Sequence, residues 1–126
     1  MTSQNIEVLS QHVLLDLYEC DVKLIDDLDY VRKTLIETAE KMKCTLLKDS
    51  FHRFSPQGVS GVLVIAESHL SIHTWPEQEF AAVDLFTCGD TSQLEAMPEI
   101  LRHAFKSARI DFKIYPRGMI PVRTKK

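Results

Sequence analysis

Cysteine, glycine and proline are scarce in this chain of 126 residues, which has three, four and five of them. The three cysteines (Cys20, Cys44 and Cys88) are an odd number without a regular spacing. They therefore exclude a disulfide scaffold and predict a protein of the reducing cytoplasm. With so little glycine and proline, no segment has the composition of a long linker. The length and a hydrophobic content of 44% predict one domain, residues 1–126, around one core.

Positive charge and long apolar runs are also missing. The chain has 15 lysine and arginine residues against 18 aspartate and glutamate residues, a formal net charge of −3. This balance predicts no nucleic-acid partner and no binding to an anionic membrane. The longest apolar run, residues 62–66, is far shorter than the ~20 residues of a transmembrane helix. The polar residues 2–5 predict that no leader peptide opens the chain.

Six segments have the composition of strands, flanked by a polar arm (residues 1–10) and a basic tail (residues 123–126). The third strand is nearly all apolar, which predicts a strand that is either buried on both faces or central in the sheet. The fourth alternates polar and apolar residues, which is typical of a half-buried strand. The six predicted strands are residues 12–18, 45–54, 59–66, 70–75, 81–88 and 110–115.

Two segments have helical periodicity. The first follows Asp26 and Asp27, either of which can cap a helix, and its apolar residues are Leu28, Val31, Leu35, Ala39 and Met42. The second has an apolar stripe from Leu94 to Ala108 that Pro98 interrupts. Pro98 either kinks this helix or lies in the first turn of a shorter one.

Six strands and two helices, some joined by short turns, predict an α+β fold. The expected architecture is a two-layer sandwich, in which a mainly antiparallel sheet carries both helices on one face. The other face would then need a cover, and this predicts a homodimer.

The reactive side chains are densest between Glu67 and Glu77. A zinc site of His69, His73 and Cys88 is disfavoured, because four residues along a strand span about 13 Å. No G-x-S-x-G motif surrounds Ser68, so a serine-hydrolase site is not indicated. On these residues alone, the segment is equally explained as the polar edge of a half-buried strand.

The sequence E-S-H-L-S-I-H-T-W-P-E in this segment resembles the signature of the short prokaryotic, pyruvoyl-dependent S-adenosylmethionine decarboxylases. The similarity continues through F-H-R-F-S-P-Q-G-V-S-G-V at Phe51–Val62 and A-A-V-D-L-F-T-C-G at Ala81–Gly89. The resemblance implies a two-layer α/β sandwich that dimerises into four layers (αββα) with shared active sites. It implies no metal ion.

The same resemblance implies that the protein makes its cofactor by self-cleavage between Glu67 and Ser68. The products would be residues 1–67 and residues 68–126, the latter blocked by a pyruvoyl group derived from Ser68. That group would form a Schiff base with the substrate and accept the electrons released with CO2. His73 would be the base for processing, and Ser60 would stabilise the oxyanion at Glu67.

The remaining roles implied by the resemblance concern the substrate. Cys88 would return a proton to the decarboxylated carbon. The adenine would stack between Phe54 and Trp75, and Glu77 would bind the ribose hydroxyls. His69 is left with a structural role.

The resemblance predicts S-adenosylmethionine as the substrate. The product would be decarboxylated S-adenosylmethionine, the aminopropyl donor for spermidine synthesis. The same chemistry on arginine or ornithine remains an alternative. So does an unprocessed homologue that acts as a regulatory or binding partner.

Overall fold

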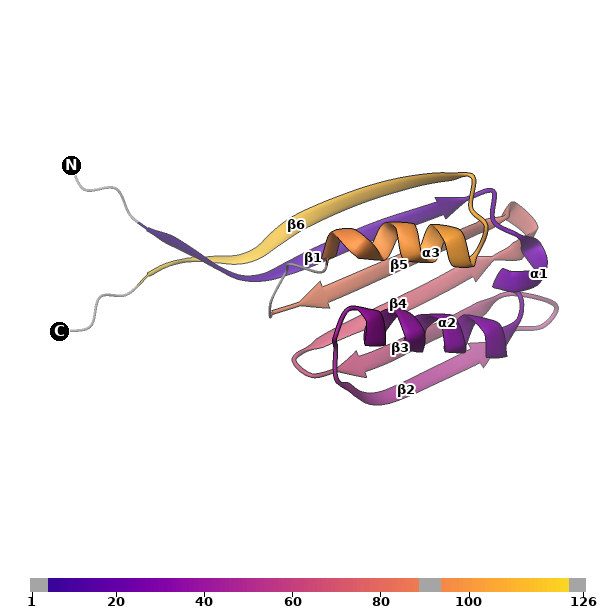
Figure 1. The fold of residues 1–126 in the computed structure, drawn as a ribbon, viewed down its shortest axis with the longest axis horizontal. Coiled ribbons are helices and arrows are strands. Elements are labelled where there is room, and N and C mark those ends of the chain that lie inside the picture. The colour runs from indigo at the N-terminus through magenta and orange to yellow at the C-terminus, as the bar shows by residue number, and fades with distance from the viewer. Residues whose placement is uncertain (1–4, 89–93, 123–126) are drawn as a thin grey trace.

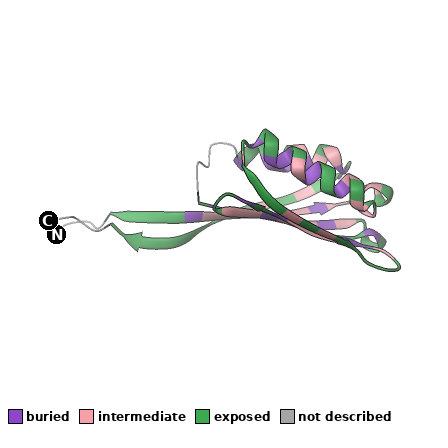
Figure 2. Ribbon diagram, turned by 90° about the horizontal axis from the view of Figure 1, so that it is seen from below, coloured by how far each residue is buried: buried purple, intermediate pink, exposed green. Residues whose placement is uncertain are grey.

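The computed structural model describes residues 5–88 and 94–122 as one antiparallel sheet with helices on a single face (Figures 1 and 2). The strand order is β2-β3-β4-β5-β1-β6. This confirms the predicted α+β sandwich. The strands are β1 (Ile6–Tyr18), β2 (Leu46–Arg53), β3 (Val59–Ile65), β4 (Ser68–Trp75), β5 (Phe80–Thr87) and β6 (Arg109–Pro121). The helices are α1 (Val22–Ile25), α2 (Leu28–Lys41) and α3 (Met97–Ala104), with 3-10 turns η1 (Pro76–Gln78) and η2 (Leu94–Ala96).

The first turn of each helix is stabilised by a capping aspartate or contains a proline. Asp27 caps α2 by accepting a hydrogen bond from the backbone N–H of Tyr30 at 3.2 Å. Asp21 caps the one-turn helix α1, which the sequence patterns did not predict. Pro98 lies in the first turn of α3, where its missing N–H costs no hydrogen bond. Of the two alternatives for the second helix, the shorter helix with Pro98 in its first turn is therefore correct.

The core lies between the sheet and the helices. Alternate residues of each strand point into it, as the pattern of β4 predicted, and α2 contributes the stripe of Val31, Leu35 and Ala39. The opposite face of the sheet, here called the open face, carries no helix in the described parts of the chain (Figure 2). Val64 lies on this face with 42% of its surface exposed. Strand β3 is thus an interior strand, between β2 and β4, and within one chain it is buried on one face only.

Two predictions need correction. Residues 6–10 are not a polar arm, because they belong to β1 and pair with residues 117–121 of β6. Strand β6 is also longer than residues 110–115. It contains Pro116 and Pro121, and it can do so because β6 is an edge strand, where a missing N–H is tolerated. The predicted basic tail, residues 123–126, lies outside the described residues.

No helix among residues 5–88 and 94–122 combines the length and the apolar character that a membrane crossing requires.

Candidate active site

Ser60 and His73 lie opposite each other on β3 and β4. Both side chains point to the open face, and the Oγ of Ser60 is 2.9 Å from the Nδ1 of His73. A hydroxyl can donate or accept, so this contact suits either tautomer of the ring. The two residues expected to assist processing are thus brought together by the register of the hairpin.

A cavity of about 290 Å³ opens beside this pair. Phe54 and Trp75 line it with exposed aromatic rings, and Glu77 adds a carboxylate. The rings of His73 and Trp75 are 6.3 Å apart. The structure therefore collects five of the predicted residues around one cavity; they form the Ser60–His73 group (Phe54, Ser60, His73, Trp75 and Glu77).

Ser68 lies at the other end of β4, directly after a tight turn. It pairs with Ile65, so only Ala66 and Glu67 connect the two strands. Glu67 has a φ of 59°, a left-handed conformation that residues with a side chain rarely adopt. The peptide bond between Glu67 and Ser68 thus follows a strained residue in an exposed turn.

Cys88 follows β5 directly, at the same end of the sheet as Glu67 and Ser68. It is exposed, whereas Cys20 is buried and Cys44 is half-buried. Burial raises the pKa of Cys20 to about 11 and also raises the pKa of Cys44. Of the three thiols, only that of Cys88 is open to a reactant. Glu67, Ser68 and Cys88 are here called the Ser68 group.

The two groups lie at opposite ends of β4. Ser68 and His73 are five residues apart along a straight strand, which corresponds to about 17 Å. The turn at Glu67 does not shorten this separation, because it precedes Ser68. Within one chain, the structure therefore does not bring His73 next to Ser68.

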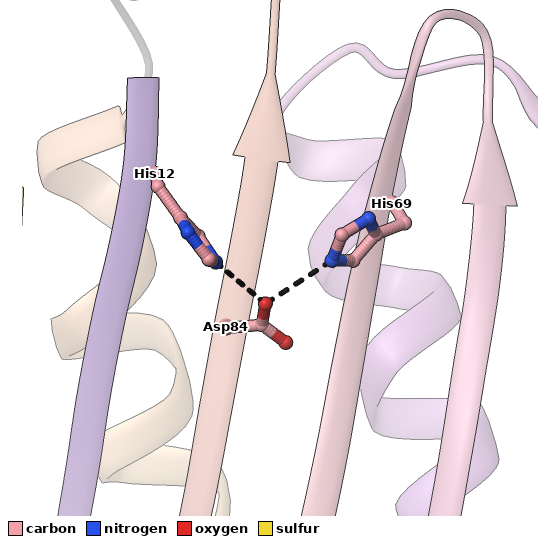
Figure 3. Close-up of side chains that lie close together, drawn as sticks. All are labelled: His12, His69 and Asp84. Atoms are coloured by element: carbon pink, nitrogen blue, oxygen red, sulfur yellow. Dashed lines mark hydrogen bonds and ion pairs between the residues drawn. The ribbon is translucent and has the colours of Figure 1, made fainter. Parts of the chain in front are cut away.

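A third cluster, which the sequence patterns missed, lies on the open face (Figure 3). The Oδ2 of Asp84 is 2.8 Å from the Nε2 of His12 and 3.1 Å from the Nε2 of His69. Ser71 donates a hydrogen bond to the other oxygen, Oδ1. Partial burial by itself would raise the pKa of Asp84, but the hydrogen bonds from Ser71, His12 and His69 outweigh it and lower this pKa.

The sequence gives only a weak signal for this cluster. Alternation along β4 and β5 places His69, Ser71 and Asp84 on one face, but His12 comes from a strand 57 residues earlier in the chain. Only the sheet topology places β1 beside β5. The structural role expected for His69 remains a prediction, which this contact with Asp84 supports.

Known proteins of one family are similar to nearly the whole chain. The family profile described as S-adenosylmethionine decarboxylase matches residues 11–118. A protein of Acidithiobacillus ferrooxidans named S-adenosylmethionine decarboxylase proenzyme is 43% identical over 112 residues, which cover 89% of this chain and 84% of that protein. A protein of the same name from Bacillus velezensis is 40% identical over 120 residues, or 95% of this chain and 94% of that protein.

A solved structure agrees with these sequence matches. The crystal structure of the adenosylmethionine decarboxylase from Aquifex aeolicus superposes with a TM-score of 0.87 at 32% identity, covering 95% of this chain and 99% of that one. Both the sequence and the fold thus match the resemblance seen in the motifs. The chain belongs to the S-adenosylmethionine decarboxylase family.

Proposed function

We propose that this protein decarboxylates S-adenosylmethionine with a pyruvoyl group that it makes from its own Ser68. The observation that carries the proposal is the cavity at the Ser60–His73 group. Residues from β3, β4 and the segments that follow β2 and β4 converge there, as the family's activity requires. Membership of the family supports the same function.

Processing uses the chain's own groups. The Oγ of Ser68 attacks the carbonyl carbon of Glu67 and converts the amide into an ester. Removal of the Cα proton of Ser68 then breaks the ester, leaving residues 1–67 with a new carboxylate. Ser68 is thereby converted to dehydroalanine. The dehydroalanine adds water and releases ammonia, which leaves a pyruvoyl group at the start of residues 68–126. His73 is the base in this scheme, and Ser60 donates to the oxyanion at Glu67.

The Ser68 group fits this chemistry. Ser68 is half-buried at the first position of a strand and follows the strained Glu67, so its peptide bond is held at a defined place. A pyruvoyl group supplies an electron sink for loss of the substrate carboxylate, which no protein side chain offers. Cys88, at the same end of the sheet, donates the proton that replaces CO2.

The Ser60–His73 group binds the substrate. Phe54 and Trp75 are 47% and 43% exposed, so their faces are available to a purine ring. Aromatic faces also attract a sulfonium cation. The Glu77 carboxylate accepts hydrogen bonds from the ribose hydroxyls.

Two copies of the chain complete the site in this proposal. The open face carries exposed apolar side chains, among them Leu14, Val64 and Tyr115, that a second sheet would cover. A twofold axis across the strands lays the Ser68 group of one copy over the Ser60–His73 group of the other. This four-layer homodimer supports a processing role for His73 despite its separation from Ser68 within one chain.

The test is the mass of the denatured protein. Dividing 14.4 kDa in proportion to 67 and 59 residues gives fragments of about 7.7 and 6.7 kDa. We expect both fragments from the natural chain, one intact species from Ser68→Ala, and both fragments from the control Ser50→Ala. CO2 release from S-adenosylmethionine, arginine and ornithine then identifies the substrate. A natural chain that stays whole contradicts the proposal and favours a regulatory partner.

A further inference from the structure

The cluster of His12, His69, Ser71 and Asp84 joins the two fragments that self-cleavage would produce. His12 belongs to residues 1–67, whereas the other three residues belong to residues 68–126. Asp84 lies on β5, between β1 and β4, so its carboxylate bonds to both neighbouring strands (Figure 3). The bond from His12 to Asp84 therefore survives cleavage as a link between the two products.

The same carboxylate anchors β4 next to its first residue. His69 follows Ser68 directly, and its ring also stacks on Phe86 with the ring planes 10° apart. Ser71 adds a second attachment two residues further on. In the continuous chain the turn at Glu67 also holds this end of β4. After cleavage that restraint is gone, and the free end of β4 keeps its backbone pairing to β3 and β5 and its side-chain bonds to Asp84. Strand ends fray more readily than strand interiors, so the side-chain bonds matter most at this end.

The other new terminus has its own attachment. The backbone N–H of Ala66 donates to the carbonyl oxygen of Thr45 at 2.9 Å, and this bond lies entirely within residues 1–67. Cleavage therefore does not release the end of β3. The start of β4 is held by backbone pairing to β3 and β5 and, in addition, by the side-chain bonds to Asp84.

The side-chain atoms of His12, His69 and Asp84 lie within 4.8 Å of one another, a spacing that a metal ion could also use. The surroundings favour hydrogen bonds instead. The Nη1 of Arg117 is 3.2 Å from the Nδ1 of His12, and a guanidinium only donates. The Nδ1 of His12 must then accept, so its Nε2 carries a proton toward Asp84 and cannot bind a metal. The Arg117 cation also opposes a divalent ion.

We propose that Asp84 is a positioning residue that, after self-cleavage, holds the new amino-terminal end of residues 68–126, and with it the group derived from Ser68, in the place required for decarboxylation. This inference rests on the proposed function. A displacement of about 1 Å at a reacting group can cost 100-fold in rate, so an anchor one residue away matters. The anchor is partly buried and accepts three hydrogen bonds, which makes it stronger than an exposed ion pair.

The test compares Asp84→Asn in two backgrounds: the natural chain, which is cut, and Ser68→Ala, which stays whole. The measurement is hydrogen exchange of the backbone amides of residues 69–72, which are present in both the cut and the whole chain. We expect Asp84→Asn to be cut completely and to speed this exchange at least about tenfold in the cut chain. In the whole chain, where the turn still holds β4, we expect little change. Asp49→Asn, which removes another carboxylate in an ion pair, is the matched control and leaves the exchange unchanged.

Two further readouts separate positioning from general support of the fold. In the cut Asp84→Asn protein, kcat falls at least about tenfold while KM changes little, because the partners of Asp84 (His12, His69 and Ser71) do not line the substrate cavity. His69→Gln keeps an N–H donor for Asp84 and retains slow exchange, whereas His69→Ala does not.

The outcomes that overturn the proposal differ from failure of the proposed function. Faster exchange in both backgrounds means that Asp84 supports the fold or the dimer as a whole, and unchanged exchange in both means that it anchors nothing. An Asp84→Asn chain that is never cut places Asp84 in processing instead. A natural chain that shows only the 14.4 kDa mass overturns the proposed function, and this inference falls with it.

Discussion

At the scale of single residues, the pair of Ser60 and His73 is the clearest candidate for processing. The two side chains face each other across β3 and β4 at 2.9 Å, and each lines the substrate cavity. A base contributes roughly 10²- to 10⁴-fold to a proton transfer. A donor to an oxyanion contributes roughly 10²- to 10³-fold, so the expected contribution of His73 is at least as large as that of Ser60.

We predict that His73→Ala slows self-cleavage by about 100-fold or more, and that Ser60→Ala slows it by no larger a factor. The measurement is the rate at which the 14.4 kDa species gives two fragments. The control is His103→Ala, because His103 lies on α3, away from both groups. Cleavage of His73→Ala at the natural rate would remove His73 from the processing machinery.

Cys88 is predicted to act after processing rather than during it. Cys88→Ala should be cut at the natural rate and then lose about 100-fold in kcat, because no acid returns the proton to the substrate carbon. Mass spectrometry measures the first step and CO2 release the second. Cys44→Ala is the control, since Cys44 is half-buried and distant in sequence from the Ser68 group. Equal losses in both variants would indicate a general effect of removing a thiol.

At the scale of elements, the turn between β2 and β3 is held by the end of α1. Asp26 accepts a hydrogen bond from the backbone N–H of Gly58 through Oδ1 and one from Arg53 through Oδ2, each at 2.8 Å. Gly58 has a φ of 105°, a conformation that favours glycine. The turn carries Phe54, so Asp26 fixes one wall of the substrate cavity from outside it.

We predict that Asp26→Ala lowers the free energy of unfolding by about 1 to 2 kcal/mol at pH 7 and raises the KM for S-adenosylmethionine. Denaturant unfolding and steady-state kinetics measure the two effects. Glu40→Ala removes an exposed carboxylate of α2 and serves as the control. A normal KM in an Asp26→Ala protein of reduced stability would show that the turn keeps Phe54 in place without this anchor.

The stability difference also depends on pH. The hydrogen bond from Gly58, and after it that from Arg53, lowers the pKa of Asp26 below its ordinary value of 3.8. Such a carboxylate stabilises the fold above its ordinary pKa, and this contribution is lost as the pH falls through the lowered value. We therefore predict that the difference between the natural chain and Asp26→Ala shrinks as the pH falls below the ordinary pKa of 3.8 and through the lowered pKa of Asp26. A difference that stays constant over this range would mean that the charge of Asp26 is not involved.

Local sequence patterns predicted most of these elements, because each pattern reports the surroundings of its own segment. Alternation in β4 and the stripe in α2 mark the residues that reach the core. The sequence patterns did not predict features that depend on the position of a strand in the sheet. Proline ends an interior strand but not an edge strand, and β6 is an edge strand that extends beyond the predicted residues 110–115. The apolar composition of β3 does not show what covers each of its faces, and within one chain Val64 is 42% exposed.

At the scale of the whole molecule, the candidate site also has features that local sequence patterns predict and features that depend on the strand order. The motif predicted which residues act, and the hairpin register places Ser60 beside His73. The spacing of five residues along one strand already predicts that Ser68 lies about 17 Å from His73. The motif does not predict the contact of His12 with Asp84, which depends on β1 lying between β5 and β6. Distances between segments follow from strand order, which no local pattern encodes.

The Ser68 group and the Ser60–His73 group lie far apart within one chain, so each site would need two copies. Two inactive variants that are expressed together can test this. If each site combines the Ser68 group of one copy with the Ser60–His73 group of another, Ser68→Ala and His73→Ala lack different halves of it. Neither variant is cut alone. A mixed dimer has one site with both natural residues, and in that site the Ser68 of the His73→Ala chain is cut.

We predict that coexpression of the two variants yields fragments of about 7.7 and 6.7 kDa, as 67 and 59 residues of the 14.4 kDa chain require. With equal amounts and random pairing, about half of the His73→Ala chains meet a partner that supplies the missing histidine. The control replaces the Ser68→Ala chain with one that carries both substitutions, and no cleavage is expected because no copy then contributes His73. If a tag on one variant copurifies the other, which shows mixed dimers, and the coexpressed chains still remain whole, each site belongs to a single chain. The strand β4 would then have to rearrange to bring His73 to Ser68.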